Sequence, residues 1–255
     1  MPEAYERHLV PGVFRPFASD LAVRAGALRP RTVLELAAGT GALTSALLTA
    51  VPTASVVATD LNEAMVAAGS AREPRADWQQ ADAQELPFED GSFDLVLCQF
   101  GVMFFPDRPA AYSEVRRVLA PQGRFMFNSW GTLASHGFGA AFQAALERSM
   151  PDGAPSFLED VPHGYTDPAV VAADLAAAGL TLATVEAVTL EGVAESAASV
   201  ATGFLTGTPV SAAVQSRDDA QTLQAAITQK LTDCLGPGPV TAPMTATVYT
   251  AHHQT

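Results

Sequence analysis

The stretch that decides the fold is TVLELAAGTGALTSALL, residues 32 to 48. An apolar run ends at Leu36, and an amphipathic helical pattern begins at Ala42. Between them stand Gly39 and Gly41, and glycine permits positive φ and lets a ligand approach the backbone closely. The first N–H groups of the following helix lack partners within the helix and favour an anion. The stretch predicts a strand, a tight turn and a helix; at this point a purely structural turn is an open alternative.

On both sides of this stretch, short apolar runs alternate with helical patterns, which is typical of a mainly parallel sheet with helices on its faces. Asp107 is expected to be a helix N-cap, and Asp167-Pro168 is expected to open a later helix that ends at Gly179. Because short links join the last segments, the final two strands are expected to pair antiparallel at the sheet edge. The expected strands are 32–36, 55–59, 76–80, 93–98, 123–129, 181–190 and 244–251, and the expected core helices are 42–50, 62–70 and 108–119.

Composition excludes several classes of function. Charged residues make up 16% of the 255 residues and hydrophobic residues 48%, so the chain folds around a core. The net charge of −13 leaves few cations to replace the counterions of a phosphate backbone, which makes nucleic acid an unfavourable partner. Cys98 and Cys234 lie far apart without companion ligands, so neither a metal site nor a disulfide is expected, and Cys98 is expected to be a buried bystander.

The sequence also bears on location and assembly. The N-terminus MPEAYERHLVPG lacks a basic segment followed by an apolar run, so we expect a cytoplasmic protein. Residues 196–215 are almost free of charge, but Gly203, Gly207 and Pro209 interrupt them, unlike a membrane span. The sequence does not fix the oligomeric state, and a homodimer is open.

Ligand-type residues follow successive expected strands. Asp60 ends the second strand, where a carboxylate can accept both hydroxyls of a ribose, although a cap for the next helix is also open for Asp60 or Asn62. Asp82 follows the third strand, where it can accept from an adenine amino group. Gln99 and Phe100 end the fourth strand. In open α/β sheets, ligands bind at these carboxyl ends.

With these residues in place, the chain resembles the class I S-adenosylmethionine-dependent methyltransferases, in the branch related to ubiquinone and menaquinone C-methyltransferases. The stretches LELAAGTG, VVATDLNEAM, QADAQELPFEDGSFDLVLCQFGVMFFPD and RRVLAPQGRFMFNSW carry the resemblance over residues 32–130. It implies a Rossmann-like, doubly wound, seven-stranded sheet, mostly parallel with an antiparallel last strand, plus helical lid insertions. It also implies S-adenosylmethionine as cofactor and S-adenosylhomocysteine as product.

The resemblance further implies where the cofactor binds. Its methionine part would lie near the loop after the first strand, its ribose near Asp60, its adenine near Asp82 and Ala83, and its sulfonium near Gln99. One departure is that Ala37 and Ala38 precede Gly39, where the family often has a glycine earlier. The full set expected around the cofactor is Glu35, Ala37, Gly39, Gly41, Asp60, Leu61, Asp82, Ala83, Gln99, Phe100 and Phe104.

Residues 1–255 are expected to form one methyltransferase domain. Its expected parts are an N-terminal helical cover over 1–30, a cofactor-binding core over 31–131, helical insertions or lid segments over 132–178 and 193–236, and last strands over 180–191 and 243–252. The cover and the insertions lie outside the strand-helix repeat, so they are the natural lids of the pocket.

The predicted reaction is in-line transfer of a methyl group to carbon, oxygen or nitrogen of a small, largely apolar molecule. Positioning of the nucleophile supplies most of the acceleration, and no metal is required. If the nucleophile must lose a proton, Tyr5, His8, His136 and His163 are candidate bases, of which His136 is favoured first and Tyr5 second. A catalytically silent cofactor-binding module, or a fold relative that transfers no methyl, is the main alternative. A nicotinamide-dependent oxidoreductase is disfavoured because Thr44 stands where its fingerprint needs glycine or alanine.

Overall fold

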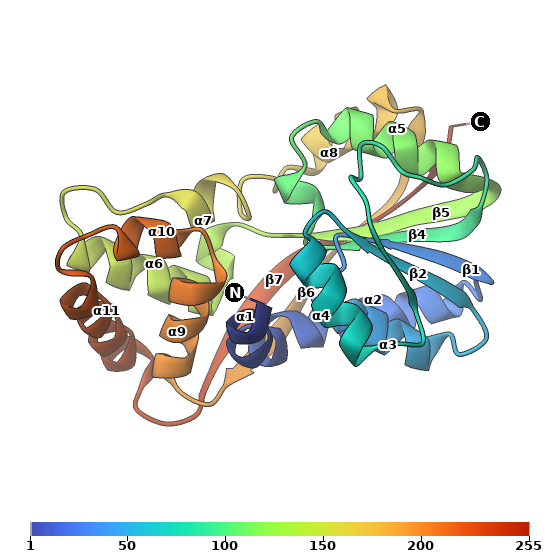
Figure 1. Cartoon of the computed structure of the whole chain (residues 1–255). Helices are drawn as coiled ribbons and strands as arrows, with labels where there is room; N and C mark the ends of the chain where they lie inside the picture. Colours follow the sequence, from blue (N-terminus) through green and yellow to red (C-terminus); the bar gives the residue numbers. More distant parts are fainter. Residues whose placement is uncertain (1, 255) are drawn as a thin grey trace. The chain divides into compact units, whose positions relative to one another are not determined.

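The structure is a computed structural model that describes residues 2–254, and the chain forms two compact units (Figure 1). The first unit comprises residues 1–17, 131–164 and 189–245, and the second comprises 18–130, 165–188 and 246–255. The helical segments that the sequence places outside the strand-helix repeat therefore gather largely in one unit. Whether both units act as one methyltransferase domain stays a prediction.

The second unit is built on a seven-stranded sheet in the order β3-β2-β1-β4-β5-β7-β6. The five strands from β3 to β5 are parallel, and β7 pairs with β5 antiparallel. The order reverses at β1, which has β2 on one side and β4 on the other, and ligands bind open α/β sheets at such a switch point. The strands are β1 Thr32–Leu36, β2 Ser55–Asp60, β3 Asp77–Gln80, β4 Phe93–Gln99, β5 Leu119–Trp130, β6 Leu180–Ala194 and β7 Val240–His253.

Helices cover both faces of this sheet, which confirms the expected fold class. On one face of the sheet lie α2 (Arg15–Ala27) and α3 (Ala42–Ala50) (Figure 1). Their leucine and alanine side chains are buried against β1, β2 and β4. On the other face lie α5 (Arg108–Val118) and α8 (Pro168–Ala177), where Tyr112 packs on Phe125 and Phe127. The helix α4 (Glu63–Arg72) connects β2 to β3.

The first unit is helical. Gly203 and Gly207 on α9 face Leu9 and Tyr5, so a helix built without side chains at these two positions packs closely on the N-terminal segment. The rings of Phe142 on α6 and Phe204 on α9 stack 4.9 Å apart. Its elements are α1 Pro2–His8, η1 Val10–Phe14, η3 Leu133–Ser135, α6 Gly137–Ser149, α7 Phe157–Asp160, α9 Ala197–Gly207, α10 Val210–Gln215 and α11 Ala220–Leu235.

The observed elements match the expected ones most closely next to the glycine turn, where β1 and α3 have the predicted bounds. The expected caps are also present: Asp107 accepts from the Ala110 N–H and Asp167 from the Ala169 N–H. Differences lie in the last strands, since β6 ends at Ala194 instead of the expected residue 190, and β7 begins at Val240 instead of residue 244. The helix expected after Asp167-Pro168 is present as α8, Pro168–Ala177, and belongs to the second unit, while a lid role for the 132–178 segment stays a prediction. Within residues 2–254, no helix is both long and apolar enough to cross a membrane.

Candidate functional site

The loop after β1 combines three left-handed residues with a helix N-terminus. Ala37, Gly39 and Gly41 have φ of +51°, +58° and +91°. Gly41 is the N-cap of α3 and supplies no capping side chain, so the first N–H groups of that helix point to the loop. A Cβ built on Gly39 would meet nothing within 4 Å. The loop is therefore a backbone cradle with open space beside Gly39, suited to an anionic group.

Asp60 ties this loop to the end of β2. Its Oδ2 accepts from the Gly39 N–H at 2.8 Å, and its Oδ1 accepts from the Asn62 N–H at 2.9 Å. Asn62 is the N-cap of α4, so the sequence alternative of a cap at Asp60 or Asn62 resolves to Asn62. Each carboxylate oxygen has a second lone pair, so Asp60 can still accept from hydroxyl groups.

Glu35 is buried beneath the same loop. Only 1% of it is exposed, and the Thr44 hydroxyl donates to its Oε2 at 2.7 Å. Burial raises its pKa to about 8, against the lowering effect of the Thr44 hydrogen bond, so the carboxyl is largely neutral near pH 7. The sequence pattern does not reveal Thr44 as the hydrogen-bond partner of Glu35.

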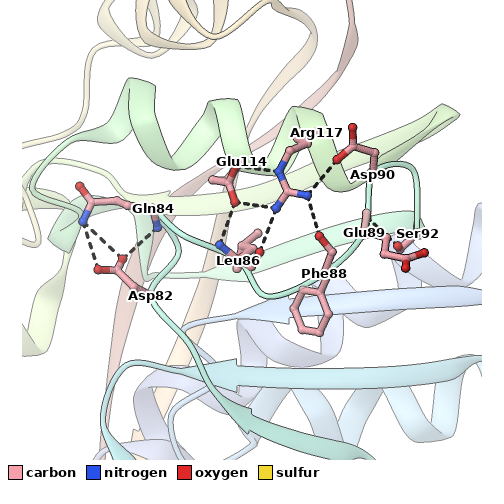
Figure 2. Close-up of polar contacts among 9 residues, drawn as sticks. All are labelled: Asp82, Gln84, Leu86, Phe88, Glu89, Asp90, Ser92, Glu114 and Arg117. Carbon is pink, nitrogen blue, oxygen red and sulfur yellow. Dashed lines mark hydrogen bonds and ion pairs between the residues drawn. The ribbon is translucent and has the colours of Figure 1, made fainter.

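Asp82 and Ala83 lie near the start of the loop between β3 and β4. The Gln84 N–H donates to Asp82 Oδ1 at 2.9 Å, and Glu85 N–H donates to the Asp82 carbonyl, so residues 82–85 form a tight turn. The Gln84 side chain lies beside the same carboxylate (Figure 2). Leu61, on the neighbouring β2 end, is 65% exposed, and its carbonyl accepts from the Gln80 side chain.

The segment after β4 is fixed by β5. Phe100 has φ of +52°, a conformation that costs a non-glycine residue about 1–3 kcal/mol and needs support from its surroundings. Asn128 gives that support, because its Oδ1 accepts from the Phe100 N–H at 3.0 Å. The Phe100 ring also stacks on Trp130, with centroids 3.7 Å apart. Asn128 was not singled out from the sequence, although its place opposite Gln99 in the β4–β5 register follows from the strand pattern.

The β1 and β4 loops meet at Gly101. A Cβ there would lie 2.6 Å from both the Ala37 Cβ and the Cys98 Sγ, so only glycine fits. Cys98 is buried, as expected, and burial raises the pKa of its thiol to about 12. Phe104, in the short helix Val102–Phe104, is 51% exposed.

The structure therefore brings the ends of β1, β2 and β4 together through Gly39–Asp60 and Ala37–Gly101 contacts. The candidate bases belong to the other unit. Tyr5 packs on Phe14, with ring centroids 5.1 Å apart. Within residues 2–254, no three His, Cys, Asp or Glu side chains are grouped so as to hold a metal ion.

His136 is a helix cap in the described contacts. Its Nδ1 accepts from the Gly139 N–H at 3.0 Å at the start of α6, and its ring packs edge-on against His163 at 5.3 Å. His163 in turn donates from Nδ1 to the Gly131 carbonyl, at 2.7 Å. Burial lowers the pKa of His136 to about 3, with a smaller contribution from His163, so its imidazole is neutral near pH 7 and a weak base.

Comparisons with known proteins agree with this geometry. Residues 34–127 match the methyltransferase domain family. The chain is 33% identical over 182 residues to the demethylmenaquinone methyltransferase of Thermus thermophilus, which covers 66% of this chain and 81% of that protein. It is 36% identical over 124 residues to the ubiquinone/menaquinone biosynthesis C-methyltransferase UbiE of Dinoroseobacter shibae, covering 45% of this chain and 50% of that one.

A solved structure, the YcgJ protein of Bacillus subtilis, superposes with a TM-score of 0.59 at 19% identity, over 94% of this chain and 99% of that one. The chain belongs to the class I S-adenosylmethionine-dependent methyltransferases. The predicted family, fold class and enzyme class are therefore confirmed.

Proposed function

We propose that the carboxyl edge around β1, β2 and β3 binds S-adenosylmethionine, and that the protein transfers its methyl group to a small, largely apolar acceptor. The observation that carries the proposal is the Asp60 carboxylate, which bridges the Gly39 and Asn62 N–H groups beside open space. When bound, the cofactor supplies a methyl carbon that its positive sulfur activates toward nucleophiles.

The chemistry of this edge matches the parts of the cofactor. The N–H groups at the start of α3 suit the amino-acid carboxylate, because a helix N-terminus favours an anion. Asp60 suits the two ribose hydroxyls, since its oxygens can accept further hydrogen bonds. Asp82 suits the adenine amino group, and the exposed side chain of Leu61 offers an apolar face for the ring.

The residues at the end of β4 would shape the methyl end of the site. Phe100 is held rigidly by Asn128 and Trp130, and Gln99 precedes it. Rigid positioning of the acceptor near the methyl group accelerates an in-line transfer, because it removes translational freedom before reaction. Phe104 contributes an exposed aromatic surface to the same segment.

The acceptor class rests on the relatives. Those named above act on demethylmenaquinone or in ubiquinone and menaquinone biosynthesis by their names. We therefore propose a hydroquinone or a comparable apolar phenol, with a carbon or oxygen nucleophile. His136 or Tyr5 as the general base stays a prediction, and the cap contact of His136 favours a supporting role.

The proposal is tested in two steps. Calorimetric titration with S-adenosylhomocysteine should give saturable binding at one site, with a micromolar dissociation constant. Incubation with methyl-labelled S-adenosylmethionine and a reduced prenylated naphthoquinone should then give labelled organic-phase product. Binding without any product from a panel of quinols and phenols would support the silent module instead, and absence of binding at millimolar ligand would overturn the site assignment.

A further inference from the structure

The loop that carries Asp82 has an external support. Residues 81–92, between β3 and β4, are twelve residues that contain no helix or regular strand. A loop of this length is usually mobile. Here the side chains of Glu114 and Arg117, on α5, hold it from one side (Figure 2).

All N–H donors of the Arg117 guanidinium take part in this support. Nη2 donates to the Leu86 carbonyl at 2.9 Å, and Nη1 donates to the Phe88 carbonyl at 2.6 Å and to Asp90 at 3.0 Å. The remaining two bonds, from Nε and Nη2, form a bidentate pair with Glu114 at 2.8 and 2.7 Å. A guanidinium has five N–H donors, so these five bonds use all of them.

Glu114 completes the support at the same loop residue. Its Oε2 accepts from the Leu86 N–H at 2.8 Å, so both backbone polar groups of Leu86 are bound by the α5 pair. Leu86 itself is 4% exposed, which anchors the loop in the core. The pKa of Glu114 is lowered, first by the hydrogen bond from Arg117, so the carboxylate stays charged over the neutral range.

The same helix holds the loop a second time, at its N-terminal end. The Asp107 N–H donates to Gln84 Oε1 at 3.2 Å, and Gln84 binds the Asp82 carboxylate through its backbone and side-chain N–H groups. Because a helix rises about 1.5 Å per residue, the attachments at Asp107 and Arg117 lie about 15 Å apart along the helix axis. Asp82 belongs to the turn that precedes the Leu86 anchor.

We propose that Arg117 and Glu114 are positioning residues that set the place of Asp82 and thereby determine the selectivity for adenine over other bases. The inference rests on the proposed function, in which Asp82 accepts from the adenine amino group. Hypoxanthine presents a carbonyl oxygen at that position, which a correctly placed carboxylate repels. A displaced carboxylate would lose the attraction to adenine and the repulsion of hypoxanthine together.

The ion pair alone is not the source of this effect. The Arg117 and Glu114 side chains are 30% and 21% exposed, and a partly exposed ion pair contributes little stability by itself. The effect comes from the planar guanidinium of Arg117, whose N–H groups donate to the Leu86 and Phe88 carbonyls and to the Asp90 carboxylate. Lysine keeps the charge but presents only three donors without this geometry.

The experiment measures the dissociation constants of S-adenosylhomocysteine and of its deaminated analogue S-inosylhomocysteine by calorimetry. Arg117→Lys is compared with Arg116→Lys, an exposed arginine on the same helix. For Arg117→Lys we expect about tenfold weaker binding of the adenosyl ligand and equal or tighter binding of the inosyl ligand, so the selectivity ratio falls at least about tenfold. Arg116→Lys should keep both constants within a factor of two.

Coupling to Asp82 gives the decisive readout. In an Asp82→Asn background, Arg117→Lys should change the selectivity ratio less than twofold, because the group it positions is already altered. Glu114→Gln should reproduce the selectivity loss, and it serves if Arg117→Lys does not yield folded protein. Equal weakening of both ligands by Arg117→Lys, or no change in either, would overturn the inference. Failure of the unsubstituted protein to bind S-adenosylhomocysteine would instead overturn the proposed function.

Discussion

The two units differ in how burial affects an ionisable side chain. The comparison is between Glu35 in the second unit and His136 in the first unit. Both are almost fully buried, at 1% and 2% exposure, and burial keeps both neutral near pH 7. The pKa of Glu35 rises to about 8, whereas that of His136 falls to about 3, because burial disfavours the charged form of each. The units should therefore respond to pH in opposite directions.

The surroundings of Glu35 and His136 also differ. Glu35 lies under the loop after β1, next to the Asp60 bridge and to the open space beside Gly39. His136 instead occupies its Nδ1 within its own unit, as the cap of α6. In the second unit, the buried Glu35 lies beside the loop of the proposed site. In the first unit, the buried His136 caps a helix.

The largest expected effect is at Asp60. Asp60→Ala removes two charge-assisted hydrogen bonds, each worth about 1.5–3 kcal/mol, and with them the support of the Gly39 turn. We expect affinity for S-adenosylhomocysteine to fall at least 100-fold in calorimetric titration. Asp77→Ala, at the exposed start of β3, is the matched control and should bind within a factor of three. Retained affinity in Asp60→Ala would show that the second unit does not bind the cofactor through this edge.

The second effect is the alkaline destabilisation that Glu35 produces. Its pKa is higher in the folded state than the ordinary 4.5, so its contribution to stability is fully present below pH 4.5 and is lost as pH rises through about 8. The loss is at most about 5 kcal/mol, from 1.36 kcal/mol for each pH unit. Glu35→Gln keeps an acceptor for Thr44 but does not ionise.

Denaturant unfolding at pH 5, 7 and 9 measures this contribution. The free energy of unfolding of the unsubstituted protein should decrease between pH 5 and 9 by several kcal/mol more than that of Glu35→Gln. Parallel curves for the two proteins would show that Glu35 keeps an ordinary pKa, and the contrast between the units would then be lost.

How much the sequence predicts depends on whether a feature is local or is built from residues that are distant in the chain. The turn after β1 was predicted with its flanking elements because its signals are local: an apolar run, two glycines and a helix pattern within 17 residues. The Asp60 bridge follows from placing a carboxylate at the neighbouring strand end. These features depend on backbone conformation, which neighbouring residues encode.

The rest depends on contacts between distant residues. Arg117 binds carbonyls 29 and 31 positions earlier, and backbone acceptors leave no signature in the sequence; the Glu114–Arg117 spacing of three is the only trace. Likewise, the gathering of three separate segments into the first unit results from packing such as Phe142 on Phe204. Residue types alone also made His136 a candidate base, because a cap and a base use the same imidazole.

A third, smaller effect distinguishes the two units through their left-handed glycines. Gly39 and Gly236 have φ of +58° and +99°, and a Cβ on either would meet nothing within 4 Å. Alanine at each should therefore cost only the backbone strain, about 1–3 kcal/mol in the free energy of unfolding. Gly39→Ala should in addition weaken S-adenosylhomocysteine about tenfold, because its methyl fills the open space of the cradle, whereas Gly236→Ala should not. Equal affinities would place the ligand away from Gly39.

The smallest effect at neutral pH is expected for His136→Asn. Asparagine is among the best helix N-caps, so the free energy of unfolding at pH 7 should change by less than about 1 kcal/mol. The difference should appear in acid. Because the pKa of His136 is lower in the folded state, its contribution is present above pH 6.5 and is lost as pH falls toward 3, and the variant should lack this loss.

The same variant decides the role of His136 in the reaction. A general base typically contributes a factor of about 10²–10⁴ to the rate, so a fall in kcat of that size with unchanged KM would assign His136 to proton transfer despite its cap contact. A cap predicts a change of less than threefold, with a flattened acid limb of the stability curve. Tyr5→Phe, assayed in parallel, removes the hydroxyl of the second candidate base and keeps the ring packed on Phe14. If both variants keep full kcat, neither side chain is the base, and His8 and His163 are the candidate bases that are left in the first unit.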